Sequence, residues 1–102
     1  MIMLRIEPDL FSALRAGFWA AVAGDEAPIS AKLLSRLRPA LADAAAAAPP
    51  HRTVLVMLES IAELYALGDC FAVGGEGHPC VTAEQWDAIN TLIDQAVGAA
   101  TL

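Results

Sequence analysis

The sequence predicts an all-α protein of one domain, residues 1–102, folded as a small antiparallel four-helix bundle. Three observations predict this class. Apolar residues recur at spacings of three and four over most of the chain, which is the period of a helix. Residues 53–67, TVLVMLESIAELYAL, are apolar on nearly every side, which is typical of a buried helix. Most connections between the expected helices are short, and short connections join antiparallel neighbours in helical bundles.

The expected first helix follows an extended arm. Residues 1–7, MIMLRIE, alternate only weakly and have no evident strand to pair with, so the sequence favours an arm packed on the bundle. Pro8 fits the first position of a helix, where a missing N–H costs nothing, and Asp9 places negative charge at the positive end of the helix. Gly24 is expected to end this helix, and residues 25–28 connect it to the next.

A proline interrupts the expected second helix. Ser30 fits the N-cap, and leucines and alanines keep the helical period up to the alanine run at 44–48. Pro39 removes one backbone donor and crowds the preceding turn, so it is expected to kink the helix or split it in two. The pair Pro49-Pro50 then ends the helix.

The expected central helix, residues 52–67, stops at Gly68 and leads into a glycine-rich loop, residues 69–81. The last helix is expected to begin at Thr82. Thr82 and Gln85 occupy the two positions of a capping box, in which each side chain bonds the backbone N–H of the other residue. This is the most clearly signalled helix start in the sequence.

The charge distribution indicates the kind of partner. The net charge is −6, and no lysine or arginine follows Arg52. Seven acidic residues lie in the second half of the chain: Glu59, Glu63, Asp69, Glu76, Glu84, Asp87 and Asp94. Because an acidic surface repels phosphate, the sequence disfavours direct binding of nucleic acid. It favours a protein partner with a basic surface, or contact between the acidic half of one copy and the basic half of another.

The chain is unusually apolar. Hydrophobic residues make up 57% of it, and a small domain has a limited interior, so part of this apolar surface is expected to stay outside. Exposed apolar area predicts an interface with a partner or between copies of the chain. The alanine run at 44–48 and Gly17 would let helices of two copies approach closely. No segment reads as a membrane span or a signal peptide, so a cytoplasmic protein is expected.

The predicted loop contains three residues that could bind a metal, Cys70, His78 and Cys80, and its two cysteines are ten positions apart. A structural zinc site needs four ligands, usually in closely spaced pairs, and these residues meet neither condition. His51 cannot complete the set, because an intact central helix would hold it about 28 Å from Cys70. A disulfide between the two cysteines would need an oxidising compartment. The favoured interpretation is two free thiols and no cofactor.

These observations lead to three hypotheses of function. The first is a non-enzymatic interaction module that binds a protein partner, of the inhibitor, immunity, anti-defence or assembly-adaptor type. The second is a homo-oligomeric structural subunit. The third is a thiol- or metal-dependent sensor that uses the Cys70–Cys80 loop. Under the first hypothesis, the candidate contacts for a basic partner are Glu59, Glu63, Glu84, Asp87, Asp94 and the aromatic Trp19.

Overall fold

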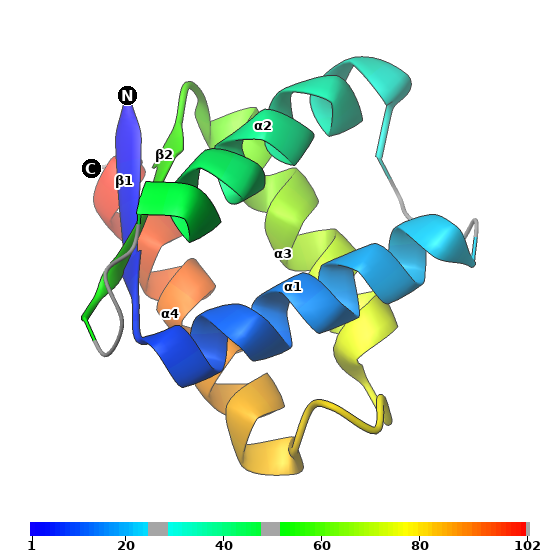
Figure 1. Ribbon diagram of the computed structural model, residues 1–102. Coiled ribbons are helices and arrows are strands. Elements are labelled where there is room, and N and C mark those ends of the chain that lie inside the picture. The colour runs from blue at the N-terminus through cyan, green and yellow to red at the C-terminus, as the bar shows by residue number, and fades with distance from the viewer. Residues whose placement is uncertain (25–28, 48–51, 102) are drawn as a thin grey trace.

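The computed structural model describes residues 1–24, 29–47 and 52–101, which form four helices and a two-stranded sheet (Figure 1). In chain order the elements are β1 (Ile2–Ile6), α1 (Pro8–Ala23), α2 (Ala31–Ala47), β2 (Val54–Leu58), α3 (Ile61–Gly75) and α4 (Ala83–Ala100). The prediction of a mainly helical protein is confirmed. The expected connection at 25–28, the helix end at 49–50 and the position of His51 lie outside the described residues. Within the described ranges, no helix combines the length and the apolar content that spanning a membrane requires.

The predicted arm and the first half of the predicted central helix are wrong, because these segments pair with each other as strands. In the antiparallel sheet of β1 and β2, Leu4 lies opposite Val56 and Met3 lies opposite Met57. Alternate residues of β2 are buried, which is the period-two pattern of a half-buried strand. The β-branched Val54 and Val56 favour an extended backbone. Two helices separate the strands in the chain, and this separation hid the pairing.

Helix α3 continues through much of the segment that was predicted to be a loop. It runs from Ile61 to Gly75, so Gly68 lies inside the helix and does not end it. Gly68 packs against α4, since a Cβ at this position would lie 3.0 Å from Cγ2 of Ile93. Residues 76–82 alone connect α3 to α4. The glycine that seemed to stop the helix therefore serves close packing between helices.

Helix α2 passes through Pro39 without a break. The predicted split is therefore wrong. Pro39 is exposed, while Leu37 and Leu41 on either side of it are buried in the core. Burial of these two leucines offsets the loss of the backbone hydrogen bond that Pro39 cannot make.

Helix α1 crosses α3 at a contact built from glycines (Figure 1). A Cβ on Gly17 would lie 2.7 Å from Cδ1 of Phe71, and a Cβ on Gly74 would overlap with the carbonyl oxygen of Gly17. The two backbones approach this closely because neither glycine carries a side chain. Gly17, which the sequence offered as a contact between copies, is buried in a contact within the chain.

The core draws residues from all six elements. Its largest fully buried side chains are Phe18, Phe71, Leu4, Ile6, Leu14, Leu37, Leu41, Leu58, Leu64, Leu67, Ile89 and Glu63. The carboxylate in this set caps a helix: Oε2 of Glu63 accepts hydrogen bonds from the backbone N–H groups of Glu59 and Ser60, each at 2.8 Å. These bonds fix the start of α3 immediately after β2.

Trp19 of α1 lies against Arg38 of α2. The guanidinium carbon of Arg38 lies 5.0 Å from the centroid of the Trp19 ring, and the Phe18 ring meets it edge-on at 5.1 Å. This is the geometry of a cation–π contact. Trp19 therefore contributes to the packing of α1 against α2.

Candidate functional site

The connection between α3 and α4 is a tight turn that its own hydrogen bonds hold in place. Gly77 has a φ of 71°, a left-handed conformation that residues with a side chain rarely adopt. The N–H of His78 donates to the carbonyl of Gly75 at 3.2 Å, and the N–H of Val81 donates to the carbonyl of His78 at 3.0 Å. Nδ1 of His78 accepts from the N–H of Cys80 at 3.0 Å. His78 thus supports the turn with both its backbone and its ring.

The start of α4 confirms the predicted capping box. Oγ1 of Thr82 accepts from the N–H of Gln85 at 3.1 Å, and the N–H of Thr82 donates to Oε1 of Gln85 at 2.9 Å. The next residue, Trp86, reaches back to α3, where its indole Nε1 donates to the carbonyl of Ala72 at 3.3 Å. The cap and the indole together fix α4 against α3.

Two stripes of residues, one on each helix, line a groove of about 270 Å³ between α3 and α4. The stripe on α3 is Tyr65, Gly68, Asp69 and Ala72, and the stripe on α4 is Trp86, Asn90, Ile93, Asp94 and Val97. Their spacings of three and four place each set on one face of its helix. We call this site the interhelical groove.

The interhelical groove is apolar between the two helices and acidic on both sides. Ala72, Trp86 and Val97 supply partly exposed apolar surface, while Asp69 on α3 and Asp94 on α4 are both exposed. Among the described residues that line the groove there is no lysine or arginine. This combination favours a bound group that is apolar and carries positive charge at its margins.

Asn90 contributes an unsatisfied hydrogen-bond donor to the interhelical groove. Its Nδ2 atom is screened from solvent and has no hydrogen-bond partner in the part of the chain that the structure describes. An unpaired buried donor costs about 1–3 kcal/mol, so each such group calls for an explanation. Asn90 is one of the residues that line the interhelical groove.

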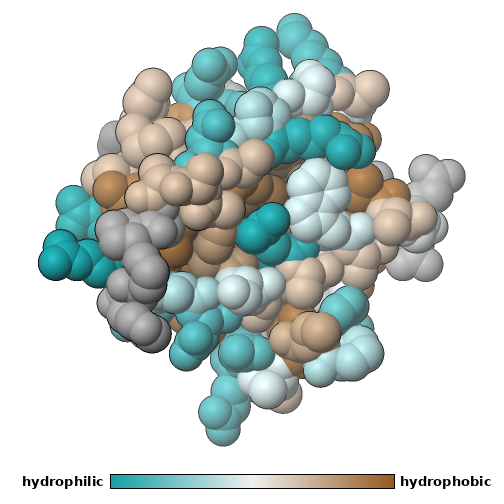
Figure 2. Space-filling model, in the orientation of Figure 1, coloured by the Kyte–Doolittle hydropathy of each residue, from teal (hydrophilic) through white to brown (hydrophobic). Residues whose placement is uncertain are grey.

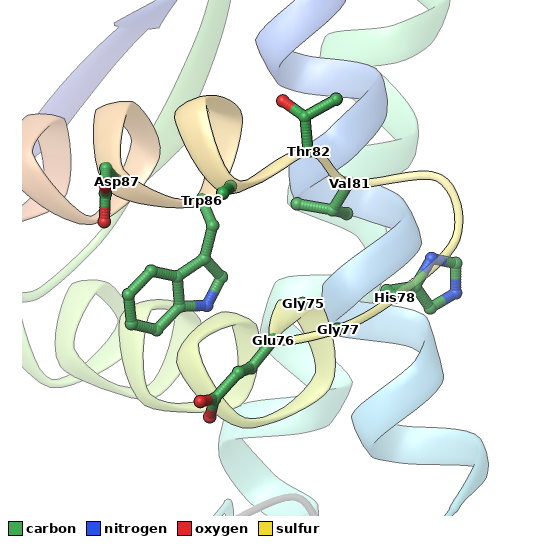
Figure 3. A pocket seen from close by; sticks show the side chains of 9 residues that line it. Gly75, Glu76, Gly77, His78, Val81, Thr82, Trp86 and Asp87 are labelled. Carbon is green, nitrogen blue, oxygen red and sulfur yellow. The ribbon is translucent and has the colours of Figure 1, made fainter.

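A second hollow, of about 480 Å³, lies beside the turn, and we call it the turn cavity. In Figure 3 the indole of Trp86 projects from α4 toward α3, with Glu76 and Asp87 on its two sides in this view and His78 across the turn. Both carboxylates are exposed. Trp86 lines the turn cavity and the interhelical groove alike, so the two hollows adjoin each other, and exposed carboxylates line both.

The structure brings some of the predicted contact residues to this face and places others elsewhere. Asp94 lines the interhelical groove, and Asp87 lines the turn cavity. Glu84 is exposed in the first turn of α4, and Glu59 is exposed just before α3. Glu63 is only 2% exposed and serves as a helix cap, so its carboxylate is not available to a partner. Trp19 lines neither hollow.

Sequence reasoning missed Tyr65, Asp69 and Asn90 as residues of the site. The helical signal was present, because Tyr65 lies four positions before Asp69 and Asn90 lies four positions before Asp94. Ending the helix at Gly68 placed Asp69 in a loop and hid the stripe on α3. Position 68 is a glycine because the side chain of Ile93 on α4 packs directly against it, and not because the helix ends there.

The two cysteines are free thiols in different surroundings. Cys70 is completely buried in α3, and this burial, with a smaller contribution from the negative charge of Asp69, raises the pKa of its thiol to about 11. Cys80 is exposed in the turn. Since the thiolate is the reactive form, Cys70 is a poor nucleophile at neutral pH. Across the described ranges, no three metal-binding side chains come together.

We expect a disulfide reagent to modify one thiol per native chain at neutral pH and two per unfolded chain. Cys80 is open to solvent, whereas Cys70 is buried and protonated. Rapid reaction of both thiols in the native protein would contradict this arrangement.

The unfolded thiol of Cys70 loses its proton near pH 9.0 and the native thiol near pH 11, so the free energy of unfolding should fall as the pH rises across this window. Cys70→Ala should remove that part of the pH dependence.

Comparison of the chain with protein-family models, with curated proteins and with solved structures gives no match.

Proposed function

We propose that this chain is a non-enzymatic interaction module whose interhelical groove binds an amphipathic helix that carries basic residues. One observation supports the proposal above all: an apolar groove lies between two exposed aspartates, Asp69 on one helix and Asp94 on the other. An exposed apolar surface with acidic margins matches a helix whose apolar face is flanked by lysine or arginine.

The dimensions of the groove suit a short stretch of helix. The stripe on α3 covers residues 65–72 and the stripe on α4 covers residues 86–97. At a rise of about 1.5 Å per residue, the two sides are about 10 and 16 Å long, which corresponds to two or three helical turns. A helix in this position would pack its apolar side chains on Ala72 and Val97, in the helix-in-groove mode of recognition.

The charge around the groove adds to its attraction for a basic partner. Glu76 and Asp87 of the turn cavity extend the acidic surface beyond the groove, and the chain as a whole carries a net charge of −6. A surface of one sign raises the rate at which partners of the opposite sign associate. Association with a basic helix should therefore slow as the salt concentration rises.

A pair of designed peptides tests the proposal. The probe is a short amphipathic peptide with leucine at helical spacing and lysine elsewhere, and the control peptide has glutamate in place of every lysine. We expect the lysine peptide to bind and the glutamate peptide not to bind in a calorimetric titration. The variant Asp69→Lys/Asp94→Lys should bind the lysine peptide about tenfold more weakly, since each exposed charge pair is worth about 0.2–1 kcal/mol and reversal adds repulsion. The same variant should gain affinity for the glutamate peptide.

A matched variant separates the groove from net charge alone. Glu7→Lys/Glu59→Lys makes the same change in net charge at two exposed positions outside the groove. It should leave the affinity for the lysine peptide within about twofold of the parent value at physiological ionic strength, where distant charges are screened. If both double variants weaken binding equally, the groove is not the site.

Replacing Asn90 by leucine should raise stability and lower affinity at once. The substitution removes a buried donor that has no partner in the described structure and keeps a side chain of similar size. The free energy of unfolding should increase by about 1 kcal/mol, as measured by urea denaturation. Binding of the lysine peptide should weaken, because the groove loses its hydrogen-bond donor. Higher stability with unchanged affinity would show that the amide has no part in binding.

A further inference from the structure

The outer face of the sheet is apolar, and the described residues of the chain leave it exposed. In β1 and β2 the residues Met3, Leu55 and Met57 are 42%, 46% and 45% exposed, and Met1 beside them is 86% exposed. Met3 lies directly opposite Met57, and Arg5 lies opposite Leu55. The large apolar side chains thus form one contiguous stripe across both strands, which marks an interaction surface.

Helix α2 extends this stripe into a groove. A hollow of about 310 Å³ is lined by residues of α2 and β2: Ala40, Asp43, Ala44, Ala47, Leu55 and Met57. The residues from α2 recur at helical spacing, and all but Asp43 are alanine. Figure 2 shows apolar surface over the C-terminal half of α2. We call the groove and the sheet stripe together the sheet face.

Opposite charges lie on the two sides of the sheet face. Helix α2, with Asp43, packs along β2, while β1 pairs with the other edge of β2 and carries Arg5. Arg52 lies near Arg5, since both line a shallow hollow beside Leu55. Asp43 on α2 and Arg5 on β1 therefore flank the apolar residues of β2, and Arg52 lies near Arg5.

We propose that the sheet face is the interface of a symmetric dimer, with a second copy of this chain as its occupant. In a twofold interface the same patch meets itself, so a patch must be complementary to its own rotated copy. A twofold axis parallel to β2 places the apolar stripes in contact. It also places Asp43 of one protomer opposite the partner's Arg5 and Arg52.

This interface is separate from the interhelical groove, because the two sites share no lining residue. A dimer built through the sheet face leaves both interhelical grooves open, so each dimer presents two copies of the proposed binding site. Binding of a partner with two basic helices would then gain from avidity. The dimer itself does not depend on the function proposed for the groove.

Sedimentation velocity of the full chain, from low to high micromolar concentration, tests this dimer. The parent protein should pass from monomer to dimer with concentration, and Met57→Lys should remain monomeric. A chain that stays monomeric throughout the range would overturn the proposal. So would a dimer that Met57→Lys leaves intact. Circular dichroism shows whether each variant keeps the helical content of the parent.

A charge exchange tests the predicted arrangement of the protomers. Asp43→Arg alone should weaken dimerisation at least about tenfold. The new arginine repels the partner's Arg5, and in a twofold dimer this repulsion occurs two times. The triple variant Asp43→Arg/Arg5→Asp/Arg52→Asp should restore the affinity toward the parent value. Asp87→Arg, which makes the same charge change in the turn cavity, should leave dimerisation unchanged. If the triple variant is no better than Asp43→Arg alone, the arrangement of the protomers is wrong.

Discussion

Replacing Gly74 by alanine is expected to lower the free energy of unfolding by about 2 kcal/mol or more. The new Cβ would overlap with the carbonyl oxygen of Gly17 and lie 2.7 Å from the backbone nitrogen of Ala21. Both neighbours are backbone atoms of α1, so no side-chain rotation relieves the clash and the helices must separate. Alanine gains about 1 kcal/mol over glycine in helix propensity, which offsets only part of the loss.

Gly98→Ala is the matched control for this substitution. Gly98 also lies inside a helix, α4, but a Cβ at this position would meet nothing within 4 Å. This variant should therefore be more stable than the parent by about 0.5–1 kcal/mol. Urea denaturation followed by circular dichroism measures both variants. If Gly74→Ala is as stable as Gly98→Ala, helices α1 and α3 do not approach as closely as described here.

Replacing Glu63 by alanine is expected to cost about 2–3 kcal/mol of stability. Its carboxylate is the acceptor for the backbone N–H groups of Glu59 and Ser60, each at 2.8 Å, and the side chain is almost wholly buried. The substitution removes both hydrogen bonds and leaves a cavity in the core. It also loosens the junction at which β2 ends and α3 begins. Thermal and urea denaturation should show the loss as a lower midpoint.

The capping box of α4 offers a control with the same motif in an exposed setting. Gln85 accepts from the N–H of Thr82 at 2.9 Å, in a hydrogen bond exposed to solvent. Gln85→Ala should cost less than about 1 kcal/mol, because water can replace the lost acceptor. Glu63→Gln keeps one acceptor oxygen and should fall between these two variants. Equal losses for Glu63→Ala and Gln85→Ala would show that burial of Glu63 adds nothing.

Helices with explicit start signals were predictable from the sequence. Pro8 begins α1, and Thr82 with Gln85 begins α4, as their local chemistry indicates. The strands were not predictable in the same way. The run VLVML at residues 54–58 is apolar throughout, and a short apolar run fits a buried helix as well as a strand. Its pairing partner, residues 2–6, is distant in the chain, so no local signal connects them.

The end of α3 was predicted wrongly because glycine occurs in helices for two different reasons. A glycine ends many helices, but it also stands wherever two backbones approach closely. Gly68 and Gly74 are of the second kind: Gly68 faces Ile93, and Gly74 faces Gly17. Only the positions of the neighbouring helices distinguish the two cases. The acidity of the second half of the chain was evident from sequence. The groove was not predictable, because one of its sides is formed by the part of α3 that continues past Gly68.

A nuclear magnetic resonance titration of isotope-labelled protein with the leucine–lysine peptide locates the bound peptide most directly. If the interhelical groove is the site, the largest changes in amide shift will cluster at Tyr65, Asp69, Asn90 and Asp94. The amide chemical shifts of β1 and β2 will change little. Small changes spread over every exposed carboxylate, or changes concentrated on the sheet face, would contradict binding in the groove.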